Sequence, residues 1–122
     1  QRLSMWNHGI IREKVEQKAH LLGIRIATIC AWKTSALAFD GSGSVTRDDN
    51  NHALATFTTG KQYNCDLSAS YNIGARYFIR ELLKSLPATE ESRAKAKVPD
   101  AGRRTSCTLS TLRTLVKELS AA

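Results

Sequence analysis

Residues 66–86 read DLSASYNIGARYFIRELLKSL, and this stretch decides the fold because it carries a sustained helical period. Its apolar residues recur at intervals of three and four, the spacing that places side chains on one face of an α-helix. Pro87 then ends the helix, because proline lacks the backbone donor that a helix interior needs. The stretch therefore predicts one long amphipathic helix, whose apolar face holds Tyr71, Ala75, Phe78, Ile79, Leu82, Leu83 and Leu86.

A second amphipathic segment lies near the start of the sequence. From Leu3 to Leu22 the apolar residues again recur at three and four, and charged residues occupy the other face. Gly23 follows at the position where a helix commonly ends with a left-handed residue. Residues 24–28 then alternate β-branched with other side chains, which predicts a short strand directly after the helix.

The middle of the sequence is dense in turn-forming residues. Residues 40–51 read DGSGSVTRDDNN and lie between two short apolar segments, residues 36–39 and 53–57. Glycine tolerates left-handed conformations, and aspartate and asparagine bond to their own backbone, so such runs favour turns. We therefore expect a β-hairpin with a long, mobile tip.

The last third of the sequence is more polar. Residues 88–106 include Pro99 and Gly102 and show no sustained apolar period, so we expect a flexible basic linker. Thr108 or Ser110 is placed to cap a final short helix. The apolar residues of that helix are Leu109, Leu112, Leu115, Val116 and Leu119.

This order of elements predicts an α+β fold that is incomplete by itself. One short strand cannot satisfy its own backbone N–H and C=O groups, which need neighbouring strands. The predicted hairpin is one candidate partner, and a sheet contributed from upstream is a better one. We expect one domain portion over residues 1–86, with the hairpin inserted at about residues 30–64, followed by the linker and short helix over residues 87–122.

The charge balance favours a polyanionic partner. Lysine and arginine number 18 against 11 aspartate and glutamate residues, which gives a net charge of +7. A basic surface gains affinity for nucleic acid because binding releases the counterions condensed on the phosphates. The candidate nucleic-acid contacts are Arg76, Arg80 and Lys84 on the long helix and Arg93, Lys95, Lys97, Arg103 and Arg104 in the linker, where the charges alternatively serve only to keep the linker solvated.

Cysteine usage and hydropathy indicate the compartment. Cys30, Cys65 and Cys107 are odd in number and widely spaced, which favours reduced thiols and a cytoplasmic protein over a disulfide framework. No apolar run approaches the roughly 20 residues that cross a bilayer, and the first residues do not resemble a signal peptide. We expect neither membrane insertion nor export.

Residues 63–73 carry a motif that spans the start of the long helix. They read YNCDLSASYNI, which resembles the last RuvC motif of the TnpB proteins, the OrfB-type products of insertion sequences. That motif runs Asp, any residue, Asn, Ala, Ala, any residue, Asn, Ile. Ser68 and Ser70 replace its first Asn and its second Ala. The matching positions are Asp66, Ala69, Asn72 and Ile73.

The first predicted helix adds to this resemblance. Trp6, the pair Lys18-Ala19 and Gly23 resemble the family's helix after its second acidic motif. The resemblance implies an RNase H-like (RuvC) fold and an RNA-guided DNA endonuclease related to the type V CRISPR effectors, with DNA and guide RNA as partners.

The implied chemistry is cleavage of a phosphodiester by two Mg²⁺ or Mn²⁺ ions about 3.5–4 Å apart. Such hard cations prefer carboxylate oxygens, and the family supplies three, in the order Asp, Glu, Asp. Asp66 matches the third, whereas the first two would precede the helix that begins near Leu3. The resemblance therefore implies that this chain is inactive without an N-terminal portion.

The family also carries a zinc ribbon of two C-x-x-C pairs before its last aspartate. Here Cys30 is one candidate ligand, but Lys33 occupies the place of its partner, and no cysteine lies near residues 57–60. Four ligands are needed for a tetrahedral structural site. We expect no zinc, and we expect Trp32, Phe39 and Phe57 to pack the base of the hairpin instead.

Simpler interpretations remain beside these. An aspartate in the first turn of a helix can act as a cap with no catalytic role, so Asp66 has a structural alternative. Trp6, Tyr77 and Phe78 are predicted to be core residues and not base-stacking platforms. For the whole chain, the alternatives to a nuclease part are a basic nucleic-acid-binding remnant without chemistry and a small interaction protein.

Overall fold

The computed structural model describes residues 2–121, with side chains described from residue 9 onward. Within this part, the chain is an α+β protein with four α-helices, one 3₁₀ turn and a three-stranded antiparallel sheet. The α+β class agrees with the sequence prediction. In chain order the elements are α1 (Arg2–Leu21), β1 (Thr46–Arg47), β2 (Leu54–Thr56), β3 (Gln62–Asn64), α2 (Cys65–Ser85), α3 (Ala88–Lys97), η1 (Pro99–Gly102) and α4 (Leu109–Ser120).

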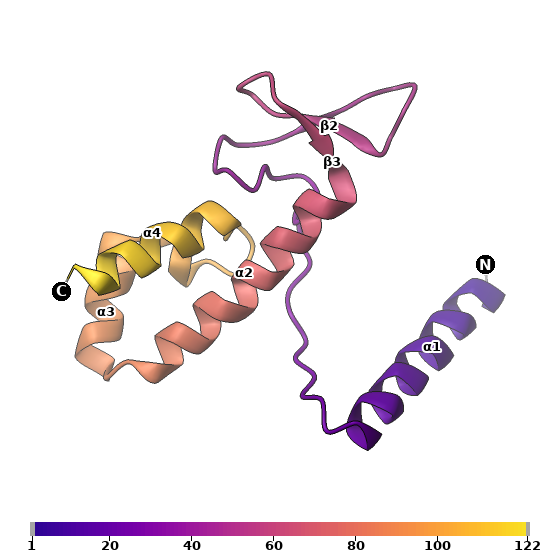
Figure 1. The fold of residues 1–122 in the computed structure, drawn as a ribbon, viewed down its shortest axis with the longest axis horizontal. Helices are drawn as coiled ribbons and strands as arrows, with labels where there is room; N and C mark the ends of the chain where they lie inside the picture. Colours follow the sequence, from indigo (N-terminus) through magenta and orange to yellow (C-terminus); the bar gives the residue numbers. More distant parts are fainter. Residues whose placement is uncertain (1, 122) are drawn as a thin grey trace.

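Helix α2 is the axis on which the other elements are arranged. The small sheet lies at its N-terminal end, and α3 and α4 pack beside its C-terminal half (Figure 1). The side chain of Asn64 caps the helix by accepting a 2.9 Å hydrogen bond from the backbone N–H of Leu67. The helix ends at Ser85, two residues before Pro87, so the long helix predicted for residues 66–86 is confirmed.

The buried face of α2 differs from the predicted one. Its buried residues follow helical spacing and are Cys65, Ser68, Asn72, Ala75, Arg76, Ile79 and Leu83. Phe78 is 56% exposed, so its prediction as a core residue is wrong, and Tyr77 is only half-buried. The polar residues Asn72 and Arg76 occupy the middle of the stripe, between two separate apolar clusters.

The first cluster joins α2 to the C-terminal helices. It contains Ile79, Leu83, Ala94, Val98, Ala101, Cys107 and Leu115. The prediction of a flexible linker is therefore wrong, because residues 88–97 form α3 and residues 99–102 form η1. The buried apolar residues of this segment are few and small, namely Ala94, Val98 and Ala101, so the sequence shows no hydrophobic period there.

The second cluster holds the sheet against the start of α2. It contains Ala38, Phe39, Ala55, Phe57 and Cys65, and the rings of Phe39 and Phe57 meet edge to face at 5.5 Å. Packing of these two phenylalanines at the base of the sheet is confirmed. Trp32 is 64% exposed, so its predicted place beside them is wrong.

The strands form a meander and not one long hairpin. Thr46 faces Thr56 across β1 and β2, and Tyr63 faces Ala55 across β2 and β3. Residues 36–39 do not pair with residues 53–57, because the chain reverses at Gly41, whose φ of 82° is left-handed, and forms a local bridge instead. The predicted single hairpin is thus replaced by three short strands.

The segment after α1 is not a strand. Gly23 ends the helix with a φ of 70°, as predicted, but residues 24–28 pair with no strand in the part of the chain that the structure describes. Ile24 and Ile26 remain exposed. The predicted strand is therefore wrong for this chain alone, since no neighbouring strand is present to complete it.

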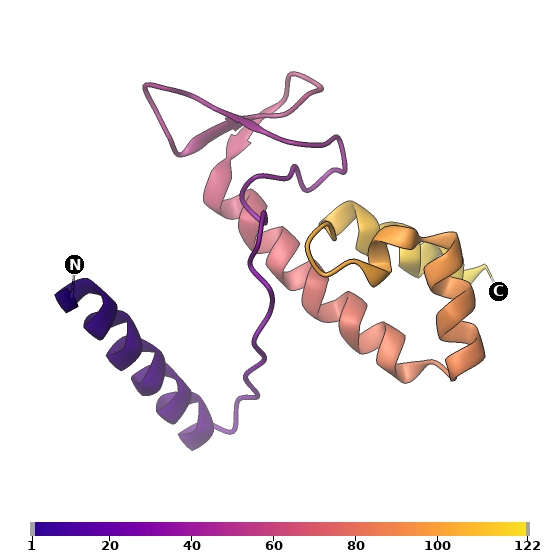
Figure 2. The same cartoon turned by 180° about the vertical axis from the view of Figure 1, so that it is seen from behind.

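Helix α1 stands apart from the other helices in both views (Figures 1 and 2). Its predicted extent is confirmed, yet Ile11 and Val15 on it are each 59% exposed. The side chains of Leu3 and Trp6 are not among those that the structure describes. None of the described helices has the length and apolar character that crossing a membrane requires.

Replacing Leu115 with alanine is expected to lower the free energy of unfolding by about 2–5 kcal/mol, because the change leaves a cavity in a buried site. Leu115 is 0% exposed at the centre of the first cluster. Its neighbour Val116 is 45% exposed, so Val116→Ala is the control and should cost less than about 1 kcal/mol. Urea denaturation measures both, and equal losses would contradict the packing of α4.

Candidate functional site

The Arg76 side chain is buried at the middle of α2 and is only 5% exposed. Its Nη1 atom donates 2.7 Å hydrogen bonds to the carbonyl oxygens of Cys30 and Trp32. Its Nε atom donates to the carbonyl of Cys107 at 3.0 Å, and Nη2 donates to that of Thr105 at 3.1 Å. One guanidinium thus ties two segments, residues 30–32 and 105–107, to the same helix.

Asn72 makes a similar set of contacts one turn earlier. Its Nδ2 atom donates to the carbonyls of Thr34 and Leu37 at 3.0 and 2.9 Å, and its Oδ1 atom accepts from the N–H of Leu109 at 3.1 Å. The side chain is completely buried. We call Asn72 and Arg76 the polar clamp, because together they hold the loop before the sheet and the start of α4 against α2.

The polar clamp changes the interpretation of two residues singled out in the sequence. Asn72 matches the RuvC-like motif, and here it bonds to three backbone groups. Arg76 was predicted to contact nucleic acid, but burial removes it from the exposed basic surface. The signal that could have found this role is the i, i+4 spacing of the Asn72 amide and the Arg76 guanidinium within an apolar helical stripe.

A pocket of about 290 Å³ opens beside the polar clamp, between α2, α3 and residues 28–30. Five of the eight predicted nucleic-acid contacts line it, together with one carboxylate, that of Glu91. We call it the basic pocket. Its cationic residues are Arg76, Arg80, Lys84, Lys95 and Arg104.

The remaining predicted contacts do not line the basic pocket. Lys97 forms a 3.6 Å ion pair with Glu118, and Arg103 lies 3.9 Å from Asp100. Arg93 is exposed on α3. These side chains are spread over the surface, so the fold gathers only part of the predicted basic set into one place.

Asp66 lies exposed in the first turn of α2. The capping hydrogen bond comes from Asn64, so the helix does not depend on the Asp66 side chain for its cap. A negative charge in the first turn is nevertheless favourable for the helix dipole. The carboxylate is therefore accessible at the end of α2 opposite to the basic pocket.

A metal centre is not assembled by the described residues alone. They contain no group of three or more histidine, cysteine, aspartate or glutamate side chains placed to hold an ion. Cys30, Cys65 and Cys107 are free thiols, and Cys65 is buried. Asp66 offers one hard oxygen ligand of the kind that Mg²⁺ prefers, and a two-metal site needs several.

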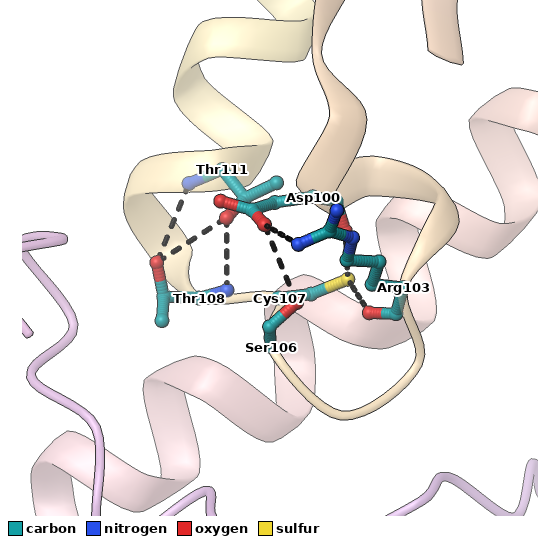
Figure 3. Close-up of polar contacts among 6 residues, drawn as sticks. All are labelled: Asp100, Arg103, Ser106, Cys107, Thr108 and Thr111. Carbon is teal, nitrogen blue, oxygen red and sulfur yellow. Dashed lines mark hydrogen bonds and ion pairs between the residues drawn. The ribbon is translucent and has the colours of Figure 1, made fainter. Parts of the chain in front are cut away.

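The turn between η1 and α4 is closed by Cys107 (Figure 3). Its Sγ atom lies 2.9 and 2.8 Å from the carbonyl oxygens of Asp100 and Arg103, which share its single S–H donor. Thr108 caps α4 in a reciprocal pair with Thr111, so of the two predicted caps Thr108 is confirmed. Burial raises the pKa of the Cys107 thiol, because water no longer stabilises the thiolate.

No family model, curated protein or solved structure matches this chain.

Alkylation with iodoacetamide near neutral pH is expected to modify Cys30 before Cys107. The thiolate is the reactive form, and a raised pKa together with burial lowers both its amount and its access at Cys107. Raising the pH should accelerate the reaction at Cys107, since a larger fraction of this thiol is deprotonated as the pH approaches its raised pKa. Peptide mass spectrometry follows each site, with the denatured chain as control. Equal alkylation rates of Cys30 and Cys107 in the folded chain would contradict the burial of the Cys107 thiol.

Proposed function

We propose that this chain is the C-terminal part of a TnpB-like, RNA-guided DNA endonuclease and supplies Asp66 to its two-metal site. The RuvC-like motif around Asp66 motivates the proposal. The observation that carries it is an accessible carboxylate at the start of a long helix, in a chain whose described residues leave several surfaces uncovered.

One such surface is the free edge of residues 24–30. The carbonyls of Thr28, Cys30 and Trp32 accept hydrogen bonds from Arg80 and Arg76 on α2. In an extended chain alternate peptide groups point to opposite sides. The peptide groups of residues 25, 27 and 29 form no backbone hydrogen bond within the described part of the chain, and a neighbouring β-strand would satisfy them.

A second uncovered surface lies on α2 itself. Leu67, Tyr71 and Phe78 recur at helical spacing and are 44%, 37% and 56% exposed. On α1, Ile11 and Val15 are equally uncovered. Large apolar side chains left exposed along a helix are a feature of contact surfaces. The RNase H-like sheet that the resemblance implies would cover them.

In the complete site, the metal ions would activate a water and stabilise the leaving oxygen of the phosphodiester. Asp66 would act as one oxygen ligand, held at a fixed place by the rigid start of α2. The other carboxylates, and the guide RNA, would come with the remainder of the protein.

The basic pocket favours a second candidate, a nucleic-acid-binding protein without chemistry. Its cluster of cationic side chains is a feature that such a function needs, and it does not depend on Asp66. Under this alternative the uncovered apolar surfaces have no assigned partner.

The proposed catalytic role is tested with a chimaera in which residues 1–122 replace the corresponding C-terminal portion of an active TnpB nuclease. We expect guide-dependent plasmid cleavage in Mg²⁺ that Asp66→Asn abolishes, because the amide is a weaker metal ligand than the carboxylate. The isolated chain should not cut DNA, since one carboxylate cannot hold two ions.

Asp49→Asn is the matched control, because Asp49 is also an exposed aspartate but lies outside the motif. It should leave cleavage by the chimaera unchanged. Cleavage that survives Asp66→Asn would contradict the catalytic role, as would a chimaera that binds guide RNA and leaves the target DNA intact. Asp66-dependent nicking by the isolated chain would contradict the need for further carboxylates.

A further inference from the structure

The charge of Arg76 is buried and meets only neutral partners. All four of its hydrogen bonds go to backbone carbonyls, and no carboxylate pairs with it among the described residues. A buried charge is costly unless an opposite charge accompanies it. The basic pocket lies directly beside this guanidinium, so an anion in the pocket would reduce the cost.

Of the four other cations of the basic pocket, Arg80 and Lys95 form ion pairs, with Glu81 and Glu91, and the other two do not among the described residues. Glu91 pairs with Lys95 at 2.7 Å, which uses the only carboxylate on the described lining. Lys84 and Arg104 are exposed and form no ion pair within the described part of the chain. Two cationic side chains are therefore free to reach a ligand at the mouth.

Arg80 is held in place at the wall of the basic pocket. Its Nη1 atom donates to the carbonyl of Thr28 at 3.1 Å, and Glu81 lies 3.7 Å from its Nη2 atom. This anchoring fixes the position of its positive charge before any ligand arrives. A pre-positioned charge loses less side-chain entropy on binding than a free one.

The volume and lining of the basic pocket limit the size and chemical class of the ligand. A volume of about 290 Å³ lies at the lower end of the range for small-ligand sites. Ile79, Leu83 and Ala101 contribute apolar wall beside the charges. This combination fits one phosphate group with a small attached organic group, and it is too small for a folded partner.

We propose that the basic pocket binds a phosphate group, either of one nucleotide unit within a nucleic-acid strand or of a free nucleotide. The inference rests on the nucleic-acid contact included in the proposed function and not on the catalytic role of Asp66. Lys84 and Arg104 contact the phosphate, and Arg80 and Arg76 supply the fixed field behind it.

The test compares two charge-matched double variants of the full chain. Lys84→Gln with Arg104→Gln removes the free cations of the basic pocket, whereas Arg93→Gln with Arg113→Gln removes two exposed cations that do not line it. The probes are a labelled oligothymidylate, 5′-AMP and inorganic phosphate, measured by fluorescence anisotropy and calorimetry. Circular dichroism checks that each variant folds.

The pocket variant should weaken binding by about tenfold or more, because each hydrogen bond between charged groups typically contributes about that factor. The control variant should change it by less than about threefold. If the pocket variant weakens binding of 5′-AMP or inorganic phosphate but not of the oligonucleotide, the ligand is a free phosphate compound. Pocket-dependent binding of the oligonucleotide alone would identify the strand.

If both variants weaken binding of the probes equally, the proposal is overturned, since the affinity then depends on the overall positive charge and not on the basic pocket. Unchanged binding in the pocket variant, or no binding of any probe to the unaltered chain at low salt, would also overturn it. Both double variants keep Asp66 unchanged. Failure of the chimaera to cleave DNA therefore bears only on the catalytic role. Failure of the pocket variant to weaken phosphate binding bears only on the basic pocket.

Discussion

The structure depends on one buried guanidinium that bonds to four backbone carbonyls. Arg76 holds residues 30–32 on one side and residues 105–107 on the other. Neither segment is a helix or strand, so their carbonyls would otherwise lack partners in the interior. Together with Asn72, this side chain joins two apolar clusters that share no buried residue. The polar clamp on α2 therefore connects the sheet cluster to the cluster of the C-terminal helices, alongside the hydrogen bond from Ser110 N–H to the Phe39 carbonyl.

The same arrangement separates the two candidate functions along one helix. Asp66 lies in the first turn of α2, and Arg80 lies 14 residues later, which corresponds to roughly 20 Å along the helix axis. A phosphate in the basic pocket therefore cannot be the phosphate that metal ions at Asp66 would cleave. A strand engaged at both places would span several nucleotides between them. The polar clamp lies between the two places and fixes their separation.

The sequence predicted the helices better than the contacts between them. The periods of α1 and α2 were long enough to give their extents, and Thr108 was correctly proposed as a cap. The helix α3 was missed because Ala94 and its neighbours bury little apolar area each. Hydropathy also placed Phe78 in the core and Arg76 on the surface, the reverse of what is found. A buried arginine has no hydrophobic signature, since its role comes from carbonyls that are distant in sequence. Five of the eight basic residues named from the sequence line the basic pocket, but the pocket itself was not predicted, because α3 was expected to be a linker.

The unfolding free energy of an Arg76→Lys variant tests this account most directly. Lysine keeps the positive charge but cannot present the planar fork of donors that reaches all four carbonyls. We predict a loss of about 3–5 kcal/mol, because one buried and three part-buried acceptors lose the guanidinium donors that bond to them. Arg93→Lys on the exposed face of α3 is the control and should change stability by less than about 0.5 kcal/mol. A change as small in Arg76→Lys as in the control would contradict the central role of the guanidinium.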